Sequence, residues 1–304
     1  MRDTRFDDWS WELVSKHGSA TTGLLWHAGG LLYCEPGAAT VWRYDPLQRK
    51  AAKWLEQTGG AAGLAADGHG RVIACETAAR RVGVYEDGKR RGTIAESFDR
   101  SAFNGPHDVT IDDRGRAWFT DPATDARPGE LGHESVFRAD PQPDGRWSIA
   151  RASLDTTRPR TALMSADGTH LYVADSPDAP GNYFGGIARS MPRQLYRYPV
   201  KADGSLDDFY VLHDFGPGRG IDGMCLNSSG QIVAAAGHNK SGPGPIIYVF
   251  APNGRIMSTH PTPVDTPTDC AFGGAGLDAL YVTFAGGEVY RVPNPGLKGR
   301  RAGG

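Results

Sequence analysis

The sequence predicts an all-β protein, a six-bladed β-propeller whose ring is closed by an N-terminal strand. Two observations predict this fold. The chain has 41 glycines and 21 prolines among 304 residues, which favours short strands with many turns over a helical bundle. One pattern also occurs six times: a small or polar residue, a few apolar positions, a Gly/Asp turn, and a strand of alternating apolar residues. Such repetition is typical of propellers, whereas a β-sandwich, the alternative, gives no reason for six copies.

Each copy of the pattern predicts one blade. The copies begin 40 to 61 residues apart, and each contains two short strands joined by a tight turn such as Asp67-Gly68 or Asp167-Gly168. In chain order they read TGLLWHAGGLLYCE from Thr22, AGLAADGHGRVIACE from Ala62, HDVTIDDRGRAWFTD from His107, TALMSADGTHLYVAD from Thr161, DGMCLNSSGQIVAAA from Asp222 and DCAFGGAGLDALYVT from Asp269.

Further strands complete the predicted blades. They lie in the segments VWRYDP, RVGVYEDGK, SVFRADP, QLYRYPV, IIYVFAPNG and GGEVYRVP. The last blade ends near Val292 one strand short, and segment 11–14 is expected to supply that strand, because an open edge invites aggregation. We therefore expect a single domain over 1–304, with 1–20 as the closing segment and 294–304 as a tail.

Composition excludes several classes of partner. The chain has 33 Lys and Arg against 35 Asp and Glu, so it lacks the basic surface of a nucleic-acid binder. The N-terminus has no apolar signal core, and no run approaches the roughly 18 apolar residues of a membrane span. Four cysteines lie in apolar stretches without metal-type spacing, which indicates free thiols. A cytoplasmic protein without membrane or nucleic-acid partners is expected, and its oligomeric state is left open.

The first positions of the six copies predict a functional site. In a propeller the starts of the innermost strands meet at one mouth of the channel. Polar groups that converge in a concavity form a binding or catalytic site. The alternative is that some of them only satisfy strand-end backbone groups, which suits Asp269 and Thr161. Trp26, and Tyr183 in the Gly/Pro-rich segment 176–193, are further candidates for substrate contact. The converging positions are Thr22, Ala62, His107, Thr161, Asp222 and Asp269.

Five of these stretches resemble the gluconolactonase / senescence-marker-protein (regucalcin-like) family. They are GLAADGHGRVIACETAARRV, NGPHDVTIDDRGRAWFTDP, ALMSADGTHLYVADS, IDGMCLNSSGQIV and CAFGGAGLDALYVT, and they follow the family's order between about Thr22 and Val292. The resemblance implies a six-bladed propeller, a divalent metal, usually calcium, in the channel, and hydrolysis of sugar lactones or related esters.

The metal ligands that the resemblance implies are largely replaced. The family's glutamate aligns with Thr22, and its two asparagines align with His107, which keeps its neighbour Asp108, and with Thr161. Asp222 alone matches outright. Calcium prefers six to eight oxygens with carboxylate charge, and a His/Asp pair suits zinc better.

Two mechanisms remain open at this point. A divalent ion, calcium or zinc, could bind at Asp222 and His107 and activate water on a lactone or ester of a small hydroxylated substrate. Alternatively there is no metal, and His107, with a pKa of about 6.5, is the acid/base group, oriented by Asp222 or Asp108. The second mechanism also serves an isomerase, lyase or cyclase. A non-catalytic ligand-binding propeller is the third alternative.

Overall fold

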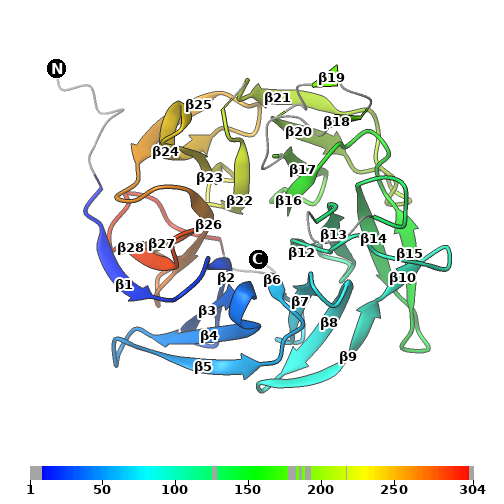
Figure 1. The fold of residues 1–304 in the computed structure, drawn as a ribbon, viewed down its shortest axis with the longest axis horizontal. Coiled ribbons are helices and arrows are strands. Elements are labelled where there is room, and N and C mark those ends of the chain that lie inside the picture. The colour runs from blue at the N-terminus through cyan, green and yellow to red at the C-terminus, as the bar shows by residue number, and fades with distance from the viewer. Residues whose placement is uncertain are drawn as a thin grey trace.

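The computed structural model is a six-bladed β-propeller, as the sequence predicts (Figure 1). It describes residues 9–124, 129–176, 183–184, 187–188, 193–216 and 218–300. Each blade is a four-stranded antiparallel sheet. Among the described residues, no helix has the length and apolar character needed to cross a membrane.

Blades 1 to 3 follow one another in chain order, from the innermost strand outward. Blade 1 consists of β2 (Thr22–His27), β3 (Gly30–Glu35), β4 (Thr40–Asp45) and β5 (Lys50–Glu56). Blade 2 consists of β6 (Ala61–Ala66), β7 (Val72–Glu76), β8 (Arg81–Glu86) and β9 (Lys89–Ala95). Blade 3 consists of β12 (Val109–Ile111), β13 (Ala117–Asp121), β14 (Ser135–Pro141) and β15 (Trp147–Arg151).

Blades 4 and 5 repeat this order, and blade 6 combines the two ends of the chain. Blade 4 consists of β16 (Pro159–Met164), β17 (His170–Asp175), β20 (Gln194–Pro199) and β21 (Tyr210–Asp214). Blade 5 consists of β22 (Ile221–Leu226), β23 (Ile232–His238), β24 (Ser241–Phe250) and β25 (Ile256–Pro261). Blade 6 consists of β26 (Pro267–Gly273), β27 (Ala279–Phe284), β28 (Glu288–Val292) and β1 (Glu12–Lys16).

Short elements lie between some of these strands. A 3₁₀ turn at Pro36–Ala38 links β3 to β4. Two small hairpins lie outside the blades, and they are β10 (Ser97–Phe98) with β11 (Ser101–Ala102) and β18 (Tyr183–Phe184) with β19 (Ile187–Ala188).

The N-terminal strand closes the ring, which confirms the prediction. β1 pairs antiparallel with β28, with Glu12 opposite Arg291 and Lys16 opposite Glu288. The Arg291 Nε donates to the Glu12 carboxylate at 2.7 Å. The first and last parts of the chain thus meet in one blade (Figure 1).

Alternating side chains of each strand form the contacts between blades. In β3, Leu31 and Tyr33 pack against blade 6, whereas Leu32 and Cys34 pack against blade 2. Strands buried on both faces explain why the apolar runs of the second strands are nearly continuous. The described residues form six core clusters, and each cluster joins two neighbouring blades.

The six innermost strands contact one another in a closed ring: β2, β6, β12, β16, β22, β26 and back to β2. Glycines allow this close approach. A Cβ at Gly63 would lie 2.6 Å from the carbonyl oxygen of His107, and a Cβ at Gly223 would lie 2.7 Å from the Cα of Asp269. Because real Cβ contacts are longer, glycine after the first position of a blade brings the next blade's polar residue to the axis.

Candidate active site at the starts of the inner strands

A cavity of about 270 Å³ lies beside the starts of the inner strands. Thr22, Ala62 and His107, three of the predicted first positions, line it. The same three residues also line a narrow space of about 10 Å³, together with Asp222 and Asp269. The structure therefore brings five of the six predicted positions together.

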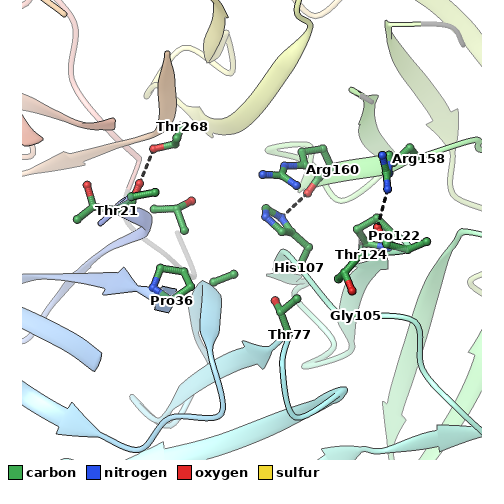
Figure 2. A pocket seen from close by; sticks show the side chains of 14 residues that line it. Thr21, Pro36, Thr77, Gly105, His107, Pro122, Thr124, Arg158, Arg160 and Thr268 are labelled. Atoms are coloured by element: carbon green, nitrogen blue, oxygen red, sulfur yellow. Dashed lines mark hydrogen bonds between the residues drawn. The ribbon is translucent and has the colours of Figure 1, made fainter. Parts of the chain in front are cut away.

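The cavity has two chemically different walls (Figure 2). The cationic wall, formed by His107, Arg158 and Arg160, comes from blades 3 and 4. Arg158 donates to the carbonyl oxygen of Ala123 at 3.0 Å. Opposite it, Figure 2 shows Thr21 and Thr268, which form the hydroxyl wall of blades 1 and 6 together with Thr22, a further lining residue. The Thr268 hydroxyl donates to the carbonyl oxygen of Thr21 at 2.6 Å, and the Thr21 hydroxyl to that of Glu288 at 3.0 Å.

Asp222 anchors the cationic wall. Its carboxylate is held between two guanidinium groups: Arg160 Nε donates to Oδ1 at 2.9 Å, and Arg219 donates to Oδ2. Arg219 also donates to the carbonyl oxygen of Pro267 at 3.1 Å. Burial acts to raise the pKa of Asp222, but the two guanidinium groups hold it below its ordinary value. Asp222 is therefore an anion that fixes two arginines.

His107 is held by a backbone group rather than by a carboxylate. Its Nδ1 lies 2.9 Å from the carbonyl oxygen of Arg160 (Figure 2). Since a carbonyl oxygen only accepts, Nδ1 carries the proton of the neutral ring. Burial lowers the pKa of His107 to about 3, and the charge of Arg160 acts in the same direction. The expectation of orientation by Asp222 or Asp108 was wrong, because the ring binds the backbone of Arg160. The expected pKa near 6.5 is not kept either, because the half-buried ring loses solvation and lies beside the charge of Arg160.

Asp108 and Thr161 bind each other; neither lines the cavity of about 270 Å³, although Asp108 lines the narrow space. The Thr161 hydroxyl donates to Asp108 Oδ2 at 2.5 Å, and the amide of Ala162 donates to the same oxygen at 3.1 Å. Burial raises the pKa of Asp108 to about 6. The pair joins blade 3 to blade 4. This geometry contradicts a substrate-binding role for Thr161 and direct contact of Asp108 with the imidazole of His107.

Asp269 anchors the hydroxyl wall in a comparable way. Its two carboxylate oxygens accept hydrogen bonds from the backbone amides of Leu24, at 2.7 Å, and Cys270, at 2.8 Å. Burial raises the pKa of Asp269 well above its ordinary value. Asp269 therefore satisfies backbone groups at a strand end, which is the alternative role expected from the sequence. Through the amide of Leu24 it positions the end of β2 that carries Thr22.

The two aromatic candidates lie elsewhere. Trp26 is four residues along β2 from Thr22 and stacks on Tyr281 at a centroid distance of 6.1 Å, in the core between blades 6 and 1. Its expected contact with substrate was wrong, because the strand carries it away from the cavity. Tyr183 belongs to β18, but its side chain lies outside the described part of the chain, as does most of segment 176–193.

The residues at the implied metal position do not fit a divalent cation. Both oxygens of Asp222 accept from guanidinium groups, and the Thr161 hydroxyl donates to Asp108. The two fixed positive charges on Asp222 repel a cation, and calcium needs six to eight oxygens. The other carboxyl groups of the narrow space, Asp108 and Asp269, accept hydrogen bonds from a hydroxyl and backbone amides. Within the described ranges, no group of three or more His, Cys, Asp or Glu side chains could hold a metal ion.

Sequence reasoning missed Arg160 and Arg219. A signal was present for the first of them: Arg158 and Arg160 alternate in RPRT directly before Thr161. Residues two apart in a strand share a face, so this alternation places two cations beside a predicted first position. Arg219, three residues before Asp222, carries no comparable pattern.

The fold and the site together define a class of protein: a six-bladed propeller with a polar cavity at the starts of its inner strands. The family described as SMP-30/Gluconolactonase/LRE-like region matches residues 20–286. The chain belongs to this family, as the sequence resemblance indicates.

Relatives of known name match over most of the chain. The gluconolactonase of Zymomonas mobilis is 24% identical over 92% of this chain and 80% of its own length. The pentonolactonase XacC of Haloferax volcanii is 27% identical over 88% of this chain and 81% of its own length. Among solved structures, a gluconolactonase from Xanthomonas campestris has a TM-score of 0.78 at 23% identity, covering 96% of this chain and 91% of the other.

Proposed function

We propose that this chain is a hydrolase that opens a lactone, or a related ester, of a small hydroxylated substrate. The observation that carries the proposal is the cavity of about 270 Å³ with a cationic wall opposite a hydroxyl wall. Its volume suits a single small molecule. The near full-length match to a gluconolactonase and a pentonolactonase supports the same reaction class.

Each wall has a distinct task in this reaction. The hydroxyl group of Thr22 can exchange hydrogen bonds with a sugar-like substrate, which helps to fix its orientation. The hydroxyl groups of Thr21 and Thr268 already donate to backbone carbonyl oxygens and shape the wall. The cationic wall lies where negative charge develops on the carbonyl oxygen as water adds, and fixed positive groups stabilise such a transition state. His107 Nε2, the unprotonated ring nitrogen, can accept a hydrogen bond from the attacking water.

Hydrolysis is favoured over the alternative of an isomerase, lyase or cyclase. That alternative needs His107 to give and take a proton near neutral pH. With a pKa of about 3, the ring stays neutral there and is a poor proton donor. The lactonase names of the relatives point the same way. Small-molecule substrates and a cytoplasmic location stay predictions for this chain.

Turnover in labelled water tests the proposal. We would follow acid release from five- and six-membered aldonolactones above the uncatalysed rate, and the mass of the product in H₂¹⁸O. Arg146→Gln, which alters an exposed surface pair, is the control and should match the wild type. We expect faster lactone opening with one labelled oxygen in the product carboxylate. Rates equal to the buffer blank for every lactone would contradict hydrolysis and favour a non-catalytic, ligand-binding propeller.

A further inference from the structure

The place that the family resemblance gives to a divalent cation is occupied here by guanidinium groups. Arg160 and Arg219 come from different blades and meet on the same carboxylate, that of Asp222. Arginine stays protonated at every physiological pH, and its planar fork suits carboxylate and oxyanion partners. Two guanidinium charges meet the single carboxylate of Asp222, so this cluster carries more positive than negative charge. Asp108, whose pKa of about 6 leaves it charged at neutral pH, is a further carboxylate within electrostatic reach of Arg160.

We propose that the guanidinium of Arg160, held on Asp222 beside Arg219, supplies the positive charge of this site, so that the chain hydrolyses its lactone without a metal ion. The inference rests on the proposed function and adds to it a catalytic residue and an independence from metal.

Burial assigns different tasks to the two arginines. The side chain of Arg160 is 24% exposed and lines the cavity, whereas those of Arg219 and Asp222 are 9% and 2% exposed. Arg160 is therefore the guanidinium that a substrate can reach. Arg219 is a positioning residue, because its bond to the carbonyl oxygen of Pro267 ties the charged group to blade 6.

Arg160 also connects the charge to the imidazole. Its side chain binds Asp222, and its backbone carbonyl accepts from His107 Nδ1. One residue of β16 thus sets both the position of the guanidinium and the tautomer of the ring. Figure 2 shows the Arg160 guanidinium and the His107 ring side by side at the cavity.

The reaction balances without a further reactant. The water oxygen forms a bond to the lactone carbonyl carbon, and the carbonyl electron pair moves onto its oxygen, which accepts a hydrogen bond from Arg160. The bond between that carbon and the ring oxygen then breaks as the carbonyl re-forms. The ring oxygen takes a proton that originates from the water and leaves as the alcohol of the product hydroxy acid. His107 Nε2 accepts a hydrogen bond from the water during the attack.

The first arm of the test concerns metal. Wild-type protein is treated with a chelator, its metal content is measured, and lactone turnover is compared with and without added Ca²⁺ or Zn²⁺. Thermal melting with the same ions supplies a readout that does not depend on activity. We expect turnover within about twofold of the untreated protein and no saturable rise in Tm. Turnover that is lost on chelation and restored by either ion, or a saturable rise in Tm, would overturn the inference.

This arm separates the two proposals. If chelation abolishes turnover reversibly, hydrolysis stands and independence from metal fails. If no preparation opens any lactone, the proposed function and the role of Arg160 both fail, and the melting experiment still decides whether the site takes a cation.

The second arm concerns Arg160. Arg160→Met should lower kcat by about 10²- to 10³-fold, the loss seen when one oxyanion donor is removed, and change KM much less. The kcat of Arg160→Lys should lie between those of the wild type and Arg160→Met. Added methylguanidinium ion should partly restore the kcat of Arg160→Met. Arg91→Met, which removes a guanidinium from a surface pair with Glu86, is the matched control. A folded Arg160→Met or Arg160→Lys with kcat within about threefold of the wild type would overturn the role.

Discussion

The two walls of the cavity are anchored by the same kind of side chain in opposite states. Asp222 carries the cationic wall, and guanidinium groups hold its pKa below the ordinary value. Asp269 carries the hydroxyl wall, and burial raises its pKa far above that value. At the starts of their inner strands Asp222 is buried and Asp269 is half-buried. The identity of the partners, and not the depth of burial, decides which carboxyl is charged.

This difference separates two tasks within one small space. The cationic side holds a charge that can act on a reacting carbonyl group. The other side offers the neutral hydroxyl group of Thr22, which can bind a hydroxylated ligand without competing for that charge. A propeller can divide the tasks in this way because each blade contributes its first residues independently to the same cavity.

The largest expected effect is on stability at the two anchors. Asp222→Asn leaves the buried guanidinium of Arg219 and the half-buried guanidinium of Arg160 without their anion, which should lower the free energy of unfolding by about 3–5 kcal/mol. Asp269→Asn removes one acceptor of a backbone amide and should cost about 1–2 kcal/mol. Urea unfolding of both variants measures the difference. Equal losses would show that the two anchors do not differ in charge.

A second, smaller effect concerns the pH dependence that His107 contributes. In the folded chain its pKa is about 3, against about 6.5 in the unfolded chain. Between these values only the unfolded chain binds the proton. The stability contributed by His107 is therefore complete above pH 6.5 and is lost as the pH falls toward 3.

His107→Asn lacks this titration, so its difference in unfolding free energy from the wild type should shrink by up to about 2 kcal/mol between pH 7 and pH 5. Urea unfolding at pH 7, 6 and 5 measures it. Thr22→Val, on the opposite wall, is the control and should keep a constant difference. If the difference in unfolding free energy between His107→Asn and the wild type stays constant or widens at low pH, the imidazole of His107 is charged in the folded protein, and the prediction is wrong.

The smallest effect is on substrate recognition by the hydroxyl wall. Within the described residues, the Thr22 hydroxyl has no hydrogen-bond partner, although it lines the cavity. Thr22→Val should raise KM for a hydroxylated lactone by about 2- to 10-fold, the value of one neutral hydrogen bond, and leave kcat within about twofold. Thr259→Val, on the outer strand β25, should change neither constant. A fall in kcat at unchanged KM would move Thr22 from binding to catalysis.

Most of the fold was predictable because its determinants are local and repeated. The turn at Asp67 shows this: its carboxylate accepts from the amides of His69 and Arg71, and the same chemistry recurs at Asp167. Alternation in segments such as GLLYCE gives each strand two buried faces. Because the sixth copy lacks one strand, the N-terminal segment is the part of the chain expected to complete the last blade.

That the candidate residues lie together was predictable, but the groups that they bind were not. The ring geometry brings first positions together, so His107, Asp222 and Asp269 were found. Which groups they bind depends on long side chains that reach between blades, and Arg160 meets Asp222 from 62 residues away. No local sequence pattern indicates a contact over that separation. The pKa of His107 depends on the same arginine, so it could not be predicted either.

Ring closure by β1 also has a consequence in time. Glu12 and Arg291 are 279 residues apart in the chain, and ribosomes add about 5–20 residues per second. The first strand therefore leaves the ribosome roughly 15 to 60 s before its pairing partner exists. While the residues between them are synthesised, β1 stays unpaired, and the five blades made first remain open at both edges until the sixth is complete.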